Sequence, residues 1–282
     1  MTGTGAFAHL DWAARSDVGK VRANNEDAYG AFPEHGIWCV ADGMGGGEDG
    51  EVASSTLVRL LGNFLHSCPP KENVAYAMDE MLDGVRETLS DANDVIFRRS
   101  KTLGLRSCGS TFVGVCFNAS FPSSALAVNV GDSRLYRIRD GAAEQITHDH
   151  TMGASLGLRE SEVPAMFRGV LSRVIGVERQ VESDVTPFDV AEGDVVLLCS
   201  DGLTHMVPDD RIAEIAGSSS AADDLADRLV DAALAAGGGD NVTVVAVRVG
   251  RLPDALPQVA LQGEGDRDGG REVTLCGGDC AP

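Results

Sequence analysis

Short apolar runs, five to eight residues long, constrain the fold more than any other feature of this chain. Long segments with helical periodicity separate them. Several runs are apolar at consecutive positions, as in strands that are covered on both faces of a sheet. Such strands require a layered α/β or α+β domain. The predicted strands are residues 37–41, 111–117, 125–130, 134–138, 194–199 and 242–249.

Three segments carry apolar residues at steps of three and four, the spacing of one helix face. They are residues 73–99, residues 51–66 before Pro69 and Pro70, and residues 222–236 before Gly237. Residues 147–170 mix Gly, His, Asp and Met without a period. We expect a long connection there, of the kind that borders a functional site.

Composition excludes several classes of protein. The 282 residues include 43 acidic and 23 basic ones, a net charge of −20, which disfavours a nucleic-acid-binding surface. No run of 18 apolar residues predicts a membrane helix, and the first ten residues do not form a secretory signal. Seven irregularly spaced cysteines predict no disulfide framework. We therefore expect a cytoplasmic protein without nucleic-acid or membrane partners.

The composition changes after Gly250, where Gly, Asp, Pro and Arg replace large apolar residues. We predict one domain over residues 1–250 and a disordered tail over residues 251–282. Cys276 and Cys280 in this tail supply too few ligands for a zinc site, so exposed thiols are expected.

Four aspartates lie at the ends of predicted strands. Asp42, Asp132 and Asp201 follow apolar runs, and Asp240 precedes the last one. One Asp-Gly pair predicts a turn, whereas four strand-end aspartates predict a convergent site. Carboxylates gathered at a sheet rim repel one another unless a cation compensates them. Oxygen ligands select Mg²⁺ or Mn²⁺, and two such ions could polarise a phosphoryl group.

The segment 19–27 adds groups suited to a phosphate substrate. Arg22 offers a planar fork of donors, and Glu26 and Asp27 offer further ligands or anchors for water. Alone, this segment is typical of a surface loop. Beside an acidic metal cluster it predicts a substrate clamp. Gly43, next to Asp42, lets a backbone carbonyl approach a metal ion.

Seven motifs, in this order and spacing, resemble the bacterial branch of the PPM family of metal-dependent Ser/Thr protein phosphatases, the type 2C class. They span roughly residues 9–249. Their sequences are VRANNED at 21–27, ADGMGG at 41–46 with GEVAS at 50–54, GST at 109–111, GDSR at 131–134, LSRVIG at 171–176, CSDGL at 199–203 and GDNVTVV at 239–245.

The resemblance implies an α+β fold of four layers, α/β/β/α, with two mostly antiparallel sheets between helices. It also implies two Mn²⁺ or Mg²⁺ ions at one end of the sandwich, bridged by Asp42, and direct attack of a metal-bridging water on a phosphate held by Arg22. The further ligands that it implies are the Gly43 carbonyl, Asp201 and Asp240 at the first ion. Glu26 and Asp27 would bind the second ion, directly or through water, and Asp132 would bind a third ion more weakly. Asn241 would support these ligands without binding a metal itself.

Met44 replaces the histidine that many eukaryotic members carry as general acid, so the proton donor has no assigned residue. His148 and His150 are expected to be ordinary exposed histidines. The implied function is a monomeric phosphoserine and phosphothreonine phosphatase that opposes a bacterial Ser/Thr kinase. Two alternatives remain open. One is a non-catalytic relative that binds phosphoproteins; the other is a phosphatase of small metabolites, which would prefer a sugar phosphate to a phosphopeptide.

Overall fold

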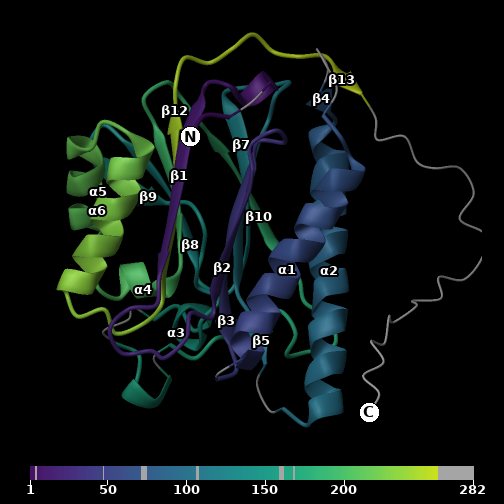
Figure 1. The fold of residues 1–282 in the computed structure, drawn as a ribbon, viewed down its shortest axis with the longest axis vertical. Helices are drawn as coiled ribbons and strands as arrows, with labels where there is room; N and C mark the ends of the chain where they lie inside the picture. Colours follow the sequence, from purple (N-terminus) through teal and green to yellow (C-terminus); the bar gives the residue numbers. More distant parts are fainter. Residues whose placement is uncertain are drawn as a thin grey trace, which may run out of the picture.

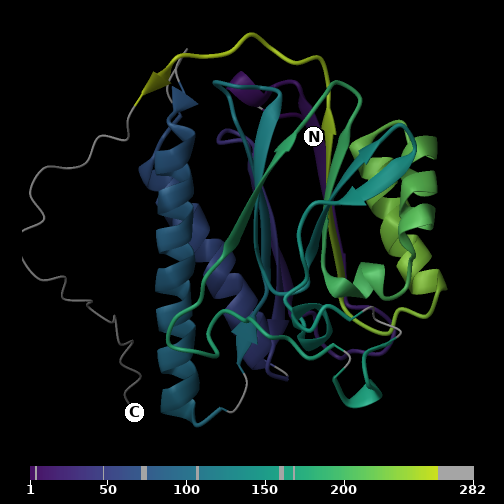
Figure 2. The same ribbon diagram turned by 180° about the vertical axis from the view of Figure 1, so that it is seen from behind.

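Two facing antiparallel sheets form the centre of the molecule, and helices cover the outer face of each (Figures 1 and 2). The computed structural model describes residues 1–3, 5–46, 48–70, 75–105, 108–158, 162–167 and 169–259. The order of layers is α/β/β/α, which confirms the α+β sandwich that the sequence motifs implied.

The first sheet has the order β1-β12-β11-β8-β9, and every neighbouring pair is antiparallel. Its outer face packs against α4, α5 and α6, where Leu225 and Leu229 lie fully buried against Leu197 of the sheet. The elements are β1 (Leu10–Asp17), β8 (Arg134–Arg139), β9 (Ala142–Gln145), β11 (Val195–Cys199), β12 (Val242–Val249), α4 (Asp201–Thr204), α5 (Asp209–Ser218) and α6 (Ala222–Ala235).

The second sheet has the order β10-β7-β6-β3-β2, and the short β5 pairs with the end of β3. Helices α1 and α2 cover it with an apolar stripe that includes Leu57, Leu61, Val85 and Leu89. The elements are β2 (Asp27–Phe32), β3 (Ile37–Met44), β5 (Gly109–Ser110), β6 (Phe112–Phe117), β7 (Ser124–Val130), β10 (Asp184–Asp189), α1 (Glu48–Ser67) and α2 (Met78–Leu103).

The core between the sheets contains a chain of aromatic contacts. Trp38 lies with its ring centroid 6.2 Å from Trp12 and 5.7 Å from Phe117, the latter in an edge-to-face arrangement. Such contacts add to the burial of apolar area. Among the described helices, none has the length and apolar character needed to span a membrane.

The structure corrects several predicted boundaries. Strand β3 runs on through Asp42 to Met44, because its last residues pair with β5. The helix predicted over residues 73–99 begins at Met78, after the short strand β4 (Ala75–Tyr76). Residues 73 and 74 lie outside the described residues. Strands β1, β2, β9 and β10, like helix α5, were not predicted.

The first residues of the predicted tail contact the domain. Leu252 and Leu256 pack against the core between the sheets, and the Leu256 N–H donates to the Ala119 carbonyl at 3.0 Å. Strand β13 (Gln258–Val259) then pairs in parallel with β4. Residues 260–282, including Cys276 and Cys280, lie outside the described residues.

The predicted connection over residues 147–170 contains two short helical elements, α3 (Met152–Ser155) and η3 (Ala165–Phe167). The Thr151 hydroxyl caps α3 by accepting from the Ala154 N–H at 3.2 Å. Another short 3₁₀ helix, η1 (Gly5–Phe7), precedes β1.

Candidate functional site

The predicted aspartates converge at one end of the sandwich. Asp42 lies in β3, Asp132 in the turn between β7 and β8, and Asp201 at the start of α4. Asp240 lies just before β12, and Asp27 is paired with Asp42 across strands β2 and β3. Asp42 interacts electrostatically with all four of the others. The structure therefore brings the predicted strand-end aspartates together in one acidic centre.

Backbone contacts hold Asp42 in place. Its N–H donates to the Thr111 hydroxyl at 3.0 Å, and its carbonyl accepts from the Thr111 N–H at 2.9 Å and the Ser110 hydroxyl at 3.1 Å. The Thr111 hydroxyl is also 2.7 Å from that of Ser133, beside Asp132. The hydroxyl groups of Thr111 and Ser133 thus link Asp42 to the turn that carries Asp132.

Asp27 has one satisfied and one unsatisfied carboxylate oxygen. The Ser200 hydroxyl donates to Oδ2 at 2.8 Å. Oδ1 is buried and has no hydrogen-bond partner among the described residues. A buried carboxylate oxygen without a donor is costly unless a cation compensates it, so this oxygen fits a metal ligand.

Asn241 ties the segment with Arg22, Glu26 and Asp27 to strand β12. Its Oδ1 accepts from the Glu26 N–H at 2.8 Å, and its Nδ2 donates to the carbonyls of Val18 and Asn24, both at 2.9 Å. The side chain is buried. Its three bonds fix the backbone from which two of the predicted ligands project.

Glycines allow the loops of the site to approach closely. A Cβ on Gly202 would lie 1.9 Å from the Asn241 carbonyl oxygen, and a Cβ on Gly43 would lie 2.1 Å from that of Gly50. A Cβ on Gly50 would lie 2.0 Å from Glu26 Oε2, so the Glu26 carboxylate lies against the first turn of α1. Side chains at these positions would separate the acidic residues.

Two nitrogen groups lie against the acidic residues. Arg22 Nη2 donates to Asp240 Oδ2 at 2.7 Å, and His205 Nδ1 is 3.4 Å from Asp201 Oδ2. In the described part of the chain, no group of three His, Cys, Asp or Glu side chains is arranged to hold a metal ion as it stands. The Arg22 and His205 side chains instead occupy positions beside two of the predicted ligands.

The pKa values of the acidic residues reflect their crowding. Burial, together with the neighbouring carboxylates, raises the pKa of Asp42 well above its usual range. Burial and the Asp201 charge likewise raise the pKa values of Asp27 and Asp132 to about 7. Carboxylates held this way gain most from a compensating divalent ion. The donor set, all oxygen, suits Mn²⁺ or Mg²⁺.

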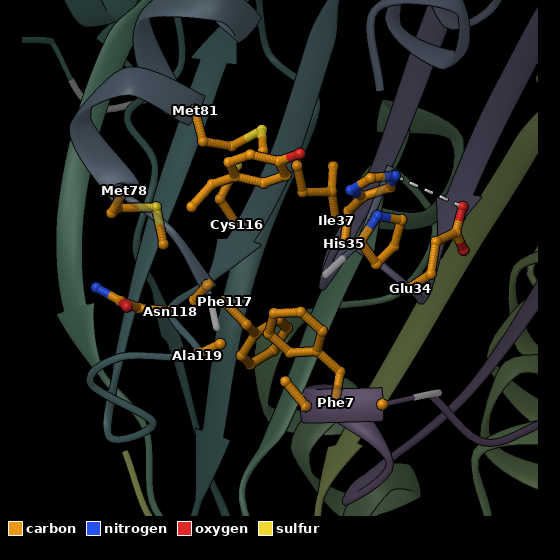
Figure 3. Close-up of a pocket in the computed structure, with 15 residues that line it drawn as sticks. Phe7, Glu34, His35, Ile37, Met78, Met81, Cys116, Phe117, Asn118 and Ala119 are labelled. Atoms are coloured by element: carbon orange, nitrogen blue, oxygen red, sulfur yellow. Dashed lines mark ion pairs between the residues drawn. The ribbon is translucent and has the colours of Figure 1, made fainter. Parts of the chain in front are cut away.

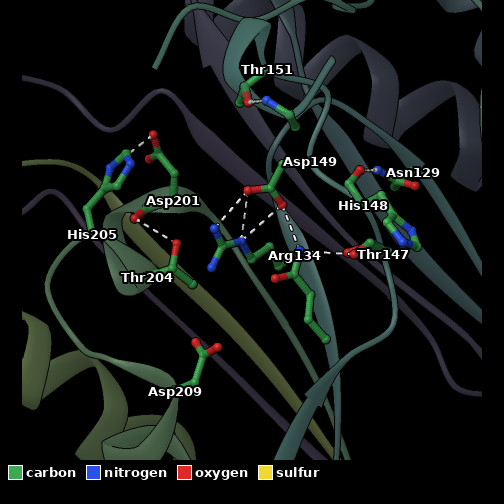
Figure 4. Close-up of polar contacts among 12 residues, drawn as sticks. Asn129, Arg134, Thr147, His148, Asp149, Thr151, Asp201, Thr204, His205 and Asp209 are labelled. Atoms are coloured by element: carbon green, nitrogen blue, oxygen red, sulfur yellow. Dashed lines mark hydrogen bonds and ion pairs between the residues drawn. The ribbon is translucent and has the colours of Figure 1, made fainter. Parts of the chain in front are cut away.

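A pocket of about 330 Å³ opens beside the acidic centre. Asp132, Asp201 and His205 line one side, and the connection over residues 147–170 lines the other with Leu158 and Phe167. The connection therefore borders the site, as predicted. Figure 4 shows the base of this connection, where Arg134 binds Asp149 through Nε at 3.0 Å and through Nη2 at 2.7 Å.

His150 is not the exposed histidine that the sequence predicted. It is 6% exposed; its Nδ1 accepts from the Gly131 N–H at 3.0 Å, and its Nε2 lies 3.1 Å from Asp184. It holds the base of the connection against the turn that carries Asp132. His148 is exposed as expected.

Sequence reasoning missed His205 and Ser200 as neighbours of the acidic residues. His205 is four residues after Asp201 in a helical turn, a spacing that places two side chains on one face. That spacing could have identified it. Ser200 precedes Asp201 directly, but its contact with Asp27 spans 173 positions and leaves no local signal.

An acidic centre at one end of a four-layer sandwich, with an arginine fork beside it, is the arrangement expected of a metal-dependent phosphatase. A family model described as protein phosphatase 2C matches residues 20–236 of this chain. The serine/threonine phosphatase stp of Listeria monocytogenes is 37% identical over 246 residues, which cover 83% of this chain and 93% of that protein. The chain belongs to the protein phosphatase 2C family.

Solved structures agree in fold. That of PppA, a key regulatory component of T6SS in Pseudomonas aeruginosa, has a TM-score of 0.75 and 33% identity, covering 85% of this chain and 97% of that chain. The catalytic domain of the serine/threonine phosphatase PstP, in complex with two manganese ions, has a TM-score of 0.72 and 34% identity. The match covers 86% of this chain and 98% of that chain.

Proposed function

We propose that this protein hydrolyses phosphoserine and phosphothreonine in other proteins, with divalent metal ions at its acidic centre. The observation that carries this proposal is the convergence of Asp42, Asp201 and Asp240, which are far apart in the sequence, at one end of the sandwich. The relatives support the reaction, and the PstP structure supports Mn²⁺ as the metal. Mg²⁺ is the second candidate because it prefers the same oxygen ligands.

The proposed roles follow the positions of the side chains. Asp42 interacts with every other aspartate of the centre, which supports its assignment as the ligand shared by two ions. The bound ions would polarise the phosphoryl group and offset the charge of the carboxylates. The other proposed ligands are Asp201, Asp240 and the Gly43 carbonyl, then Glu26 and Asp27, directly or through water, and Asp132 for a third ion.

Arg22 is proposed to bind the phosphate of the substrate. Its side chain is 50% exposed and donates to Asp240 through Nη2. If Asp240 bound a metal ion instead, the planar donors of Arg22 would be available to the phosphate. They can bind two phosphate oxygens at once.

The cellular setting is also a proposal. A phosphoprotein substrate implies a Ser/Thr kinase with the opposite activity. The five cysteines in the described part of the chain are buried free thiols, which supports a reducing cytoplasm. Helices of the same chain cover the outer face of both sheets, which supports a monomer.

We place the end of the domain near residue 259, beyond the predicted boundary at residue 250.

Substrate preference tests the proposal against its two alternatives. The Mn²⁺-loaded protein should hydrolyse a phosphothreonine peptide at least tenfold faster than glucose 6-phosphate at equal concentration. Equal or reversed rates would favour a phosphatase of small metabolites. Binding of the phosphopeptide without hydrolysis would favour the non-catalytic relative. The presence of every strand-end aspartate argues against that last alternative.

A further inference from the structure

The end of the sandwich away from the acidic centre contains a cavity of about 300 Å³. Its walls come from η1, the turn between β2 and β3, the end of β6, and the start of α2 (Figure 3). Strand β3 leaves this cavity at Ile37 and reaches the acidic centre at Asp42. At about 3.3 Å per residue, the two sites are about 16 Å apart along the strand. The cavity is therefore separate from the proposed catalytic site.

Aromatic and thioether side chains form two walls of the cavity. Met78 and Met81 of α2 project into it from one side, and Phe7 and Phe117 form another wall (Figure 3). Phe7 is held in place because it packs against Gly36, where a Cβ would come within 2.4 Å of its ring. Methionine side chains adapt readily to a ring and make favourable contacts with it. These walls suit a flat or compact apolar molecule.

The volume limits the size of the occupant. An apolar cavity of about 150 Å³ in another protein accepts benzene. The cavity here is about 300 Å³, so it has room for one ring with substituents. A long acyl chain or a peptide would not fit wholly inside it.

The charges of the described residues around the cavity disfavour an anionic ligand. None of the described residues that line it is Lys or Arg, and Glu34 lies on its rim. The chain also carries a net charge of −20. A carboxylate or phosphate would lose hydration there and meet a like charge without compensation.

One polar group inside the cavity can orient a neutral ligand. The side chain of His35 is 4% exposed, and burial lowers its pKa, so it is neutral at pH 7. A neutral imidazole offers one donor and one acceptor. Two other polar side chains line the cavity and already have partners. The Tyr76 hydroxyl donates to the Pro69 carbonyl at 2.9 Å, and Asn118 accepts at Oδ1 from the N–H groups of Ser120 and Phe121.

We propose that this cavity binds an uncharged, ring-sized organic molecule, with its ring between Met78, Met81 and Phe7 and its one hydrogen-bonding group at His35. Neither the acidic centre nor the phosphatase reaction takes part. The test is independent of activity for that reason.

The full chain labelled with ¹³C at the methionine methyl groups allows a direct test with p-cresol as the probe. The seven methionines include two at the cavity and, at the catalytic end, Met44 and Met206. We expect p-cresol to shift the Met78 and Met81 signals in a saturable way and to leave Met44 and Met206 unchanged. Benzoate, which has a similar size but a negative charge, should bind at least tenfold more weakly.

Two variants test the location. Met78→Glu puts a charge in the cavity at the first residue of α2, where a carboxylate favours the helix, and Ala6→Leu fills space without adding charge. Each should weaken p-cresol binding at least tenfold, as measured from the shift of the Met81 methyl signal. Val95→Glu on the exposed face of the same helix is the control and should bind normally. The absence of saturable shifts, undiminished binding in both cavity variants, or equal affinity for benzoate would overturn the proposal.

Discussion

Replacing Asn241 by alanine tests whether one buried amide supports the acidic centre. Asn241 is 5% exposed and bonds the Glu26 N–H and the carbonyls of Val18 and Asn24. Alanine leaves these three backbone groups without their partner. An unsatisfied buried group costs about 1–3 kcal/mol, so the free energy of unfolding should fall by about 3–6 kcal/mol after partial compensation by water.

The same substitution should also weaken metal binding. The segment that Asn241 holds carries Arg22, Glu26 and Asp27, so its loosening should raise the Mn²⁺ concentration needed for half-maximal hydrolysis at least tenfold. Both quantities are measurable, the first by urea denaturation in EDTA and the second by Mn²⁺ titration of phosphopeptide hydrolysis.

Asn93→Ala is a matched control in helix α2, outside the segment that carries Arg22, Glu26 and Asp27. Asn93 is 1% exposed and also makes three backbone bonds, to the carbonyls of Glu178 and Arg179 and from the Gly176 N–H. Its loss should lower stability by a similar amount without changing the Mn²⁺ dependence. If Asn241→Ala left the Mn²⁺ dependence unchanged as well, the inference that Asn241 positions the ligands would be refuted.

Three further predictions concern the same centre. Arg22→Ala should raise KM for a phosphothreonine peptide about tenfold or more with a smaller change in kcat, because it removes a phosphate contact; an unchanged KM in steady-state assays would exclude the clamp role. Stability of the metal-free protein should depend on pH, because Asp27 and Asp132 have pKa values of about 7 when folded and about 3.9 when unfolded. The folded state then binds more protons between about pH 4 and 7, so the free energy of unfolding in EDTA falls as pH rises through this window; a flat or rising profile in urea titrations would contradict the assignment. Gly202→Ala should lower stability and Mn²⁺ affinity, since its Cβ would meet the Asn241 carbonyl, whereas Gly217→Ala in α5, where the Cβ has open space, should be tolerated in both measurements.

Buried strands were predictable because their apolar runs carry the signal. Strand β12 was predicted with its observed bounds, Val242–Val249, and every residue from Val242 to Val247 is buried. Strand β10 was missed because it lies at a sheet edge, where its outward residues are polar and Pro187 is tolerated. Edge strands carry little apolar pattern for sequence reasoning to detect.

The main acidic residues were also predictable, because a strand end is visible in the sequence. Asp42 and Asp201 both follow buried runs, and their convergence follows from two sheets that share one end. The supporting contacts were not predictable. Asn241 meets Glu26 across 215 positions and Ser200 meets Asp27 across 173, and one sequence records no signal for such pairs.

Polar networks at the base of the connection were the least predictable part. His150 looks like an exposed loop residue in the sequence, yet Gly131 and Asp184 bind both ring nitrogens. Its burial depends on the connection folding back over the turn after β7. That arrangement comes from tertiary packing and leaves no periodic pattern.

Hydrolysis of a phosphothreonine peptide with Mn²⁺, with Mg²⁺ and with EDTA, by the natural sequence and by Asp42→Asn, tests most directly whether the convergent aspartates form a metal-dependent phosphatase centre. The variant keeps the shape of the side chain and removes one carboxylate. We expect activity with metal, none in EDTA, and a loss of at least about 1,000-fold in the variant, equivalent to about 4 kcal/mol of transition-state stabilisation. Near-normal turnover by Asp42→Asn with Mn²⁺, or full activity in EDTA, would contradict the account.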